Sequence, residues 1–345
     1  MRANLACCAS LAMLLITPLL GAQTHKVIFD TDFVFVPQDD AMALILALHS
    51  PEMEILGITT VAGNKSMERA TVDALGLLEI AGRTDIPVFR GANMPLLHEK
   101  SDFAVKAYGD WYSDEPPPAP PGGFASKKAE SRSALDFIIG TVMQNPGQIT
   151  ILAIGPLTNI AMALRMEPAF AQNVKQLVIM GGAIASLPDG GGNQTPNAEF
   201  NFWVDPEAAK VVLRSGIPTI LSPLNVSRKT RFSRQWYDKI VAVDTPLTRV
   251  IKEMMGPGFE KNPDRAGLMY DQVAAATLVD PTLMKTEELF VDVDANQGIN
   301  YGVSVGGRRP WPGAEGSRKI LVQYDLDWER FINLYVERAT KAVGK

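Results

Sequence analysis

The sequence contains little cysteine and little histidine. Of its 345 residues, two are cysteine and three are histidine. Both cysteines, Cys7 and Cys8, lie close to the N-terminus, so a disulfide framework cannot stabilise the rest of the chain. The usual nitrogen and sulfur ligands of zinc are also scarce. A metal site in this chain is therefore expected to use oxygen ligands.

Long runs of positive charge are also missing. The chain has 33 Lys and Arg against 38 Asp and Glu, a formal net charge of −5, which gives no sign of nucleic-acid binding. The densest basic stretch, Arg228 to Arg234, contains four cations. It predicts a solvated surface segment, or at most a mobile rim near a site. We therefore expect a small-molecule substrate.

The N-terminus has the pattern of a secretory signal peptide. Arg2 precedes an apolar run from Leu5 to Leu20, and small residues follow at Gly21-Ala22. The run is short for a membrane span, and polar sequence follows it. We expect residues 1–22 to be removed and residues 23–345 to form one domain. The mature protein would then be secreted or periplasmic, without a membrane anchor.

Strand-like and helix-like segments alternate along the remaining chain. This rhythm predicts an α/β fold with a mainly parallel central sheet and helices on both faces, of the Rossmann-like type. Ligands of such sheets bind beyond the carboxyl ends of the strands. A proline-rich stretch from Ser113 to Gly123 is expected to be an exposed connector. Strands are predicted at Lys26–Phe29, Glu54–Val61, Pro87–Phe89, Gln148–Ile154, Leu177–Met180 and Pro218–Leu221. Helices are predicted at Ala41–His49, Met67–Ala81, Leu157–Arg165, Pro206–Ser215 and Val273–Leu278.

The strongest chemical signal is Asp30-Thr31-Asp32, followed by Asp39-Asp40 at the head of an apolar helix. Four carboxylates within eleven residues repel one another unless a cation or protons neutralise them. Oxygen ligands at a strand end favour Ca²⁺ or Mg²⁺. The simpler interpretation is that Asp39 and Asp40 only cap the helix. One acid would suffice for that role, so the set favours a metal site.

Two further polar clusters are candidates for the same site. The segment from Asn193 to Asn201 carries amides and the carboxylate of Glu199, which suit the vicinal hydroxyls of a sugar. A polar turn is the alternative interpretation. Tyr270-Asp271 precedes the last predicted helix, where Asp271 is either a cap or a remaining metal ligand.

At this point the chain resembles the inosine-uridine-preferring nucleoside hydrolases, which are calcium-dependent ribonucleoside N-glycosidases. The resemblance covers nearly the whole mature chain. Its motifs occur in family order at Asp30–Leu44, Ile58–Asn64, Gly155–Asn159, Met180–Gly182, Asn193–Asn201 with Asp205–Ala208, and Tyr270-Asp271.

The resemblance implies a role for each matching position. Asp32, Asp40 and Asp271 would hold Ca²⁺ with the backbone carbonyl of Ile154, and Asp32 would also take the proton from the attacking water. Asp30 would support this cluster from behind. The ribose and its hydroxyls would be bound by Asp39, Asn64, Met180, Asn193, Glu199 and Asn201, with Asn64 also near the water. Family members are commonly homodimers or homotetramers, so a homo-oligomer is expected.

The chemistry of the residues agrees with these roles. Cleavage of an N-glycosidic bond develops positive charge on the ribose, as in other glycoside hydrolysis. A pocket rich in carboxylates is complementary to that charge. A bound cation orients the water, and a nearby carboxylate removes its proton.

The sequence departs from the family pattern in two places. Phe33 to Gln38 is three residues longer than the usual Pro-Gly-containing link, and we expect a bulged loop that returns the acids to register. Tyr270 stands where many members have a histidine, and Tyr108-Gly109 replaces the other family histidine. The histidines His25, His49 and His98 are expected to be structural. Tyr270, and with it Tyr108, Trp111 and Tyr112, could instead stack on the base, which favours purine nucleosides.

Two other functions remain open. The segment from Val27 to Val34 also matches a haloacid dehalogenase-type phosphatase, with Asp30 as nucleophile, Asp32 as acid/base and Mg²⁺ as cation. The lysine and later acidic pair of that class are not evident. The second alternative is an exported, catalytically inactive protein that binds a nucleoside or sugar, with catalysis lost through the insertion after Asp32.

Overall fold

The computed structural model describes residues 24–98, 101–102, 105 and 118–342. The strands of the main sheet are β1 (His25–Thr31), β2 (Met53–Thr60), β3 (Val88–Arg90), β4 (Ile149–Ala153), β5 (Val174–Met180), β6 (Thr219–Ser222), β9 (Met284–Val293), β10 (Ser304–Gly307) and β11 (Arg318–Leu326). The short strands β7 (Phe232–Ser233) and β8 (Ala266–Gly267) pair separately.

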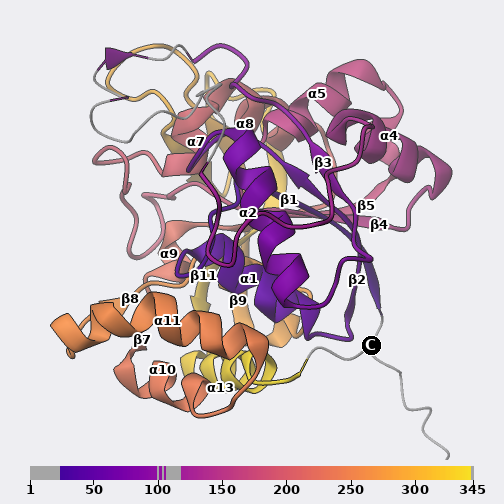
Figure 1. Cartoon of the computed structure of the whole chain (residues 1–345). Coiled ribbons are helices and arrows are strands. Elements are labelled where there is room, and N and C mark those ends of the chain that lie inside the picture. The colour runs from indigo at the N-terminus through magenta and orange to yellow at the C-terminus, as the bar shows by residue number, and fades with distance from the viewer. Residues whose placement is uncertain (1–23, 99–100, 103–104, 106–117, 343–345) are drawn as a thin grey trace, which may run out of the picture.

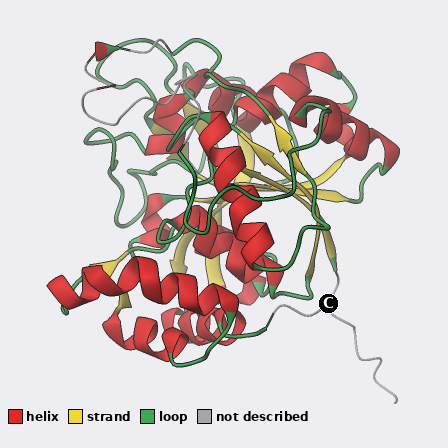
Figure 2. Cartoon of the chain, viewed as in Figure 1, coloured by secondary structure: helices red, strands yellow, loops and turns green. Residues whose placement is uncertain are grey.

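Helices surround this sheet (Figures 1 and 2). They are α1 (Asp39–Leu48), α2 (Met67–Ile80), α4 (Ala134–Gln144), α5 (Thr158–Met166), α6 (Phe170–Asn173), α7 (Phe200–Val204), α8 (Pro206–Leu213), α9 (Leu224–Ser227), α10 (Arg234–Val241), α11 (Pro246–Lys261), α12 (Asp271–Ala276), the 3-10 helix η1 (Pro281–Leu283) and α13 (Trp328–Ala339). None of the helices in the described ranges combines the length and apolar character needed to cross a bilayer.

The sheet is parallel over most of its width. Within the described residues its strand order is β10-β9-β11-β6-β5-β4-β1-β2-β3. From β3 across to β11 every neighbouring pair is parallel. Strands β9 and β10 add an antiparallel edge. The predicted α/β class with a mainly parallel sheet is therefore confirmed, whereas the antiparallel edge was not predicted.

Alternating side chains of the central strands bury the two faces of the sheet. On β1, Val27 and Phe29 lie in one apolar core with residues of α1, α12 and α13. Ile28 between them lies in a second core with residues of α4, α5 and α8. Because successive side chains of a strand point to opposite faces, both faces need a helical cover.

Local sequence explains where several helices begin. Ser66 caps α2 by accepting a hydrogen bond from the backbone N–H of Arg69. Asp205 caps α8 in the same way, with Pro206 in the first turn. Residues 1–23 lie outside the described residues, so the predicted leader stays a prediction. Residues 113–117 of the proline-rich connector also lie outside them, and its described part, residues 118–123, forms neither helix nor strand.

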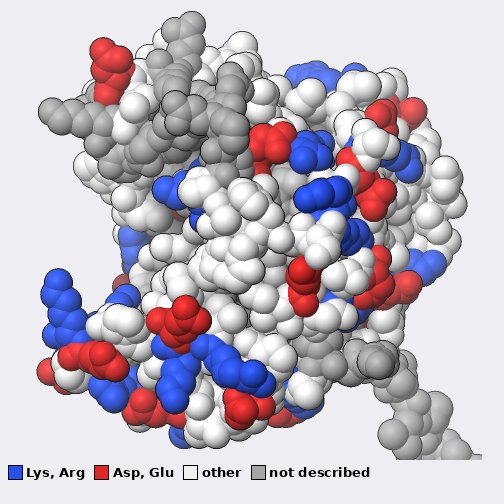
Figure 3. All heavy atoms as spheres, viewed as in Figure 1, with Lys and Arg blue, Asp and Glu red and all other residues white. Residues whose placement is uncertain are grey.

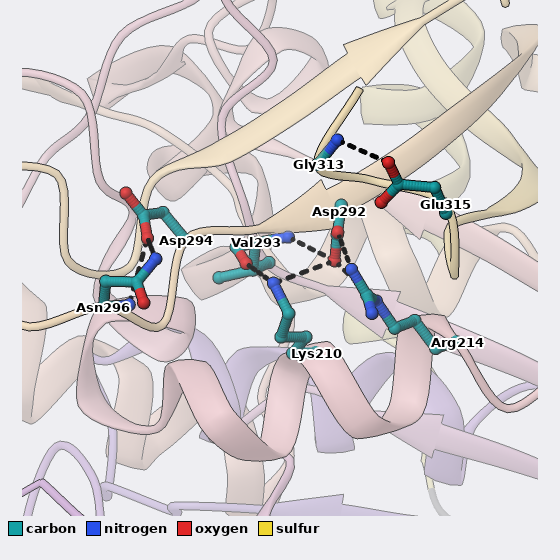
Figure 4. A network of polar contacts seen from close by, with 8 residues as sticks. All are labelled: Lys210, Arg214, Asp292, Val293, Asp294, Asn296, Gly313 and Glu315. Atoms are coloured by element: carbon teal, nitrogen blue, oxygen red, sulfur yellow. Dashed lines mark hydrogen bonds and ion pairs between the residues drawn. The ribbon is translucent and has the colours of Figure 1, made fainter. Parts of the chain in front are cut away.

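A polar network ties the antiparallel edge to α8 (Figure 4). The Asp292 carboxylate on β9 accepts hydrogen bonds from the Arg214 guanidinium. Lys210 donates to the carbonyl of Val293 at 2.7 Å, and its Nζ lies 3.5 Å from Asp292 Oδ1. The Asp292 side chain is only 6% exposed. Its negative charge is therefore buried between two cations.

We expect Asp292→Ala to lower the free energy of unfolding by about 1–3 kcal/mol, because both cations lose a buried partner. Urea denaturation measures this loss. Glu288→Ala is the matched control, since its ion pair with Lys319 is exposed. Charged side chains of both signs are scattered over the face of the molecule drawn in Figure 3. The control should change the free energy by no more than about 0.5 kcal/mol. Equal losses in both variants would contradict this assignment.

Candidate active site

The carboxyl ends of β1, β2, β4 and β5 bring the predicted polar clusters together. Asp30 lies at the end of β1 and is fully buried. Its Oδ1 accepts hydrogen bonds from Thr59 Oγ1 at 2.5 Å and from Asn159 Nδ2 at 2.8 Å. Burial raises the pKa of Asp30 to about 6, although these two donors lower it. Asp30 therefore braces the strand ends.

Three acids converge at the first turns of α1 and α12. Asp39, Asp40 and Asp271 each offer a carboxylate oxygen, and these oxygens lie within 4.8 Å of one another. Thr31 Oγ1 donates to Asp40 Oδ1 at 2.6 Å, and Asn64 Nδ2 donates to Asp40 Oδ2 at 3.3 Å. Burial, and then the charges of neighbouring acids, raise the pKa of Asp271 well above its usual range. This cluster concentrates negative charge in a buried place.

Asp32 lies beside this cluster but outside its closest set. Its Oδ2 accepts the backbone N–H of Asn64 at 2.6 Å. Its Oδ1 is buried and has no hydrogen-bond partner in the described part of the chain. The sequence predicted Asp32, Asp40 and Asp271 as one ligand set. The structure brings Asp39 together with Asp40 and Asp271, and the Asn64 backbone holds one oxygen of Asp32 beside them.

Two glycines permit this packing around Asp32. A Cβ at Gly63 would lie 2.2 Å from Asp32 Oδ2, and one at Gly155 would lie 2.7 Å from the Asp32 backbone nitrogen. Burial is the main cause that raises the pKa of Asp32 to about 7, and Asp39 adds to it. A carboxyl group with that pKa can accept and release a proton near neutral pH.

The extra residues after Asp32 form an anchored loop. Phe33 and Phe35 are buried in the core beneath it. The backbone N–H of Phe35 donates to Asp73 Oδ2 at 3.3 Å, and Arg69 forms an ion pair with Asp73 Oδ1 at 2.9 Å. The expected bulge is thus fastened to α2, and it returns Asp39 and Asp40 to the site.

Glu199 and Asn201 are fixed by the start of α7. Glu199 caps the helix, with Oε1 accepting from the backbone N–H of Asn201 and Oε2 from those of Gly182 and Phe202. Burial nevertheless raises the pKa of Glu199 to about 7. Asn201 Nδ2 donates to the carbonyls of Ile154 at 3.1 Å and Met180 at 3.2 Å. The Ile154 carbonyl keeps a second lone pair for another partner.

A cavity of about 240 Å³ opens beside these groups. Every substrate-binding residue predicted from the sequence lines it, as do Ile154, Tyr270 and Asp271. Gln38, Gln194 and Phe200 also line it and were not predicted. The full lining is Gln38, Asp39, Asn64, Ile154, Met180, Asn193, Gln194, Glu199, Phe200, Asn201, Tyr270 and Asp271.

A second cavity, of about 270 Å³, shares Gln38, Asp39 and Tyr270 with the first. Its other walls include the apolar side chains of Met255 and Phe259 of α11, together with the cation Arg265. Sequence reasoning missed this chamber, because apolar residues on an amphipathic helix look like ordinary core. Tyr270 at the junction was the one signal available. A larger cavity, of about 580 Å³ between α5 and α8, contains none of the clustered acids.

The histidines of the chain lie elsewhere. His49 ends α1 and contacts the Ile45 carbonyl, while His98 packs against Trp203. Neither these two nor His25 lines either of the connected cavities. Of the aromatic residues expected near the base, Tyr108, Trp111 and Tyr112 lie outside the described residues. Of the aromatic residues expected to stack on the base, Tyr270 is therefore the one that lies within the described residues.

A parallel α/β sheet with an acidic cluster and an amide-lined cavity at its strand ends is the arrangement of a glycosidic-bond hydrolase that uses a metal ion. Comparison with known proteins gives the family. The model of the inosine-uridine preferring nucleoside hydrolases matches residues 27–333, and the chain belongs to that family. It is a nucleoside hydrolase, as the motifs predicted. The phosphatase alternative is wrong, because the family model matches nearly the whole described chain.

The relatives of this chain carry names that state different preferences for the nucleobase. The pyrimidine-specific ribonucleoside hydrolase RihB of Escherichia coli is 33% identical over 313 residues, covering 89% of this chain and 95% of RihB. A plant nucleoside hydrolase structure is 32% identical with a TM-score of 0.76, covering 92% of this chain and 99% of its own. A purine-preferring ribonucleoside hydrolase from Gardnerella vaginalis is 28% identical with a TM-score of 0.74 and the same coverages.

We expect the metal-free enzyme to lose stability as the pH rises from about 4 to about 8. Burial raises the pKa of Asp30 to about 6 and those of Asp32 and Glu199 to about 7, whereas unfolded carboxyl groups titrate near 4. The folded protein holds more protons in this interval, so their loss destabilises it.

A divalent cation that binds these acids only in the folded state should offset the loss. Thermal melts of the metal-free enzyme with and without CaCl₂ would show a larger increase in Tm at pH 8 than at pH 5. Equal increases at both pH values would contradict the proposed electrostatic origin.

Proposed function

We propose that this enzyme hydrolyses the N-glycosidic bond of ribonucleosides with Asp32 as general base and Ca²⁺ as its resident cation. The observation that carries the proposal is the convergence of Asp39, Asp40 and Asp271 beside a cavity lined by amides and carboxylates. All the candidate donors are oxygen atoms, and the buried Asp32 Oδ1 lacks a partner among the described residues. Such a set suits Ca²⁺, which takes several carboxylate and carbonyl oxygens.

The residues divide the reaction among them. A bound Ca²⁺ supplies positive charge that orients the attacking water and makes it more acidic. As the water oxygen bonds to C1′ of the ribose, Asp32 takes the proton that the water loses. The electrons of the breaking C1′–N bond pass to the base. Asp39, Glu199 and the side-chain amides of the first cavity hold the ribose hydroxyls, and their negative charge favours the positive ribose of the transition state.

We propose that the base binds in the second cavity, beyond Tyr270. Its apolar wall from α11 suits a flat heteroaromatic ring, and the Tyr270 ring stands where the two cavities meet. Burial and the nearby charge of Asp39 raise the pKa of the Tyr270 phenol, so the phenol stays protonated at neutral pH and donates a hydrogen bond to the leaving base. We propose a leaning towards purines. The expected leader supports the proposal that the enzyme acts outside the cytoplasm. The family resemblance, and not the leader, is the ground for proposing a homo-oligomer.

Assays with inosine and uridine test the reaction. The wild type should release free base and ribose, and a chelator should abolish the release. Asp32→Asn should lower kcat by at least about 10²-fold, because the general base is lost. Binding of either nucleoside without release of base would overturn the proposed hydrolysis and leave a binding protein. Full activity in chelator, or restoration by Mg²⁺ and not by Ca²⁺, would overturn the choice of cation.

Substitutions at Tyr270 test the handling of the base. Tyr270→Phe keeps the ring and removes the hydroxyl, so kcat for inosine should fall by about 10²-fold with little change in KM. Tyr270→Ala should also raise KM, because the stacking surface is lost. Unchanged turnover of inosine and uridine in both variants would exclude Tyr270 from leaving-group chemistry. A wild-type preference for uridine over inosine would overturn the purine leaning.

A further inference from the structure

The basic stretch that begins at Arg228 does not belong to any of the family motifs. In the structure, Arg228 directly follows α9 and is only partly exposed. Its guanidinium crosses to a neighbouring loop, where Nη1 donates to the carbonyl of Asp189 at 2.5 Å and Nη2 to that of Gly192 at 3.0 Å. Arg228 therefore links α9 to a segment that lies 36 to 39 residues earlier in the chain.

This segment, residues 189–192, has an unusual backbone. Asp189 has a φ of 57° and Gly191 a φ of 116°, a region that residues with a side chain rarely adopt. Gly192 is tightly enclosed, because a Cβ there would lie 2.2 Å from the carbonyl oxygens of Thr195 and Ala198. A strained conformation persists only where surrounding contacts hold it. Arg228 supplies two such contacts, and Lys229 adds an ion pair to the Asp189 carboxylate.

The segment leads directly into the substrate cavity. Gly192 precedes Asn193, which lines the cavity and whose Oδ1 accepts the backbone N–H of Phe200 at 2.9 Å. Phe200 in turn follows Glu199 at the start of α7. A shift of the backbone at Gly192 would displace the Asn193 side chain from this wall.

The charge of Arg228 also acts on the residue at the junction of the two cavities. Burial and Asp39 raise the pKa of Tyr270, and the positive charge of Arg228 opposes them. The guanidinium therefore lies within electrostatic range of the residue at the junction of the two cavities.

We propose that Arg228 is a positioning residue for substrate binding, whose two hydrogen bonds hold residues 189–192 so that Asn193 meets the ribose. This inference rests on the proposed function. One side chain, that of Arg228, donates to two carbonyls of a strained loop at the point where the loop enters the cavity.

The test compares Arg228→Ala, Arg228→Lys and Arg231→Ala in the full enzyme with Ca²⁺ present. Arg231 belongs to the same basic stretch, is exposed, and has no hydrogen bond or ion pair to another described residue, so it is the matched control. With inosine and uridine as probes, Arg228→Ala should raise KM by about tenfold and change kcat by less than about threefold, because it removes binding shared by substrate and transition state. Arg228→Lys should recover part of the loss, and Arg231→Ala should match the wild type.

Hydrogen exchange supplies a readout that does not depend on turnover. The amides of residues 189–195 should exchange faster in Arg228→Ala than in the wild type, while those of α5 stay unchanged. An unaltered KM, a loss confined to kcat, the same increase in KM in Arg231→Ala, or unchanged exchange in the loop would each overturn the inference. If the wild type releases no base from either nucleoside, the proposed function fails, and exchange alone then decides whether Arg228 holds the loop.

Discussion

Burial of like charges at the strand ends is the constraint on which this site depends. Asp32, Asp40 and Asp271 are almost entirely removed from solvent, and removing a charge from water is costly unless it is paired. The residues that line the first cavity include no lysine or arginine. The protein thus leaves its negative charge without a matching cation of its own, which favours a bound metal ion and a positively charged transition state.

The rest of the fold holds the acids of the site close together against their mutual repulsion. Neutral donors supply most of the restraint: hydroxyls of Thr31 and Thr59, the amide of Asn159 and backbone N–H groups. Thr31 and Thr59 belong to strands of the central sheet and Asn159 to α5, whereas the Asn64 N–H lies in the loop between β2 and α2. Polar groups fixed in this way are oriented before the substrate arrives and need little reorganisation during the reaction.

The sequence predicted the site best where residues that act together are also close together in the chain. The acids of residues 30–40 are close in sequence, and alternating strand and helix patterns placed them at a strand end. The position of Asp39 in the closest group was not predictable, because it depends on how the inserted loop packs against α2. Asp73, which anchors that loop, is completely buried, and the helical pattern of residues 67–81 gave no sign of this. The antiparallel direction of β9 also depends on a connection that local patterns do not encode.

The acidic group is assembled from opposite ends of the polypeptide. Asp39 and Asp40 precede most of the sheet, whereas Asp271 follows α11 and comes late in the chain. A nascent chain therefore carries its first acids for most of its synthesis before their third partner exists. Fragments that stop short of α12 lack a complete group, so this hydrolase cannot be divided there into a working half and a dispensable one.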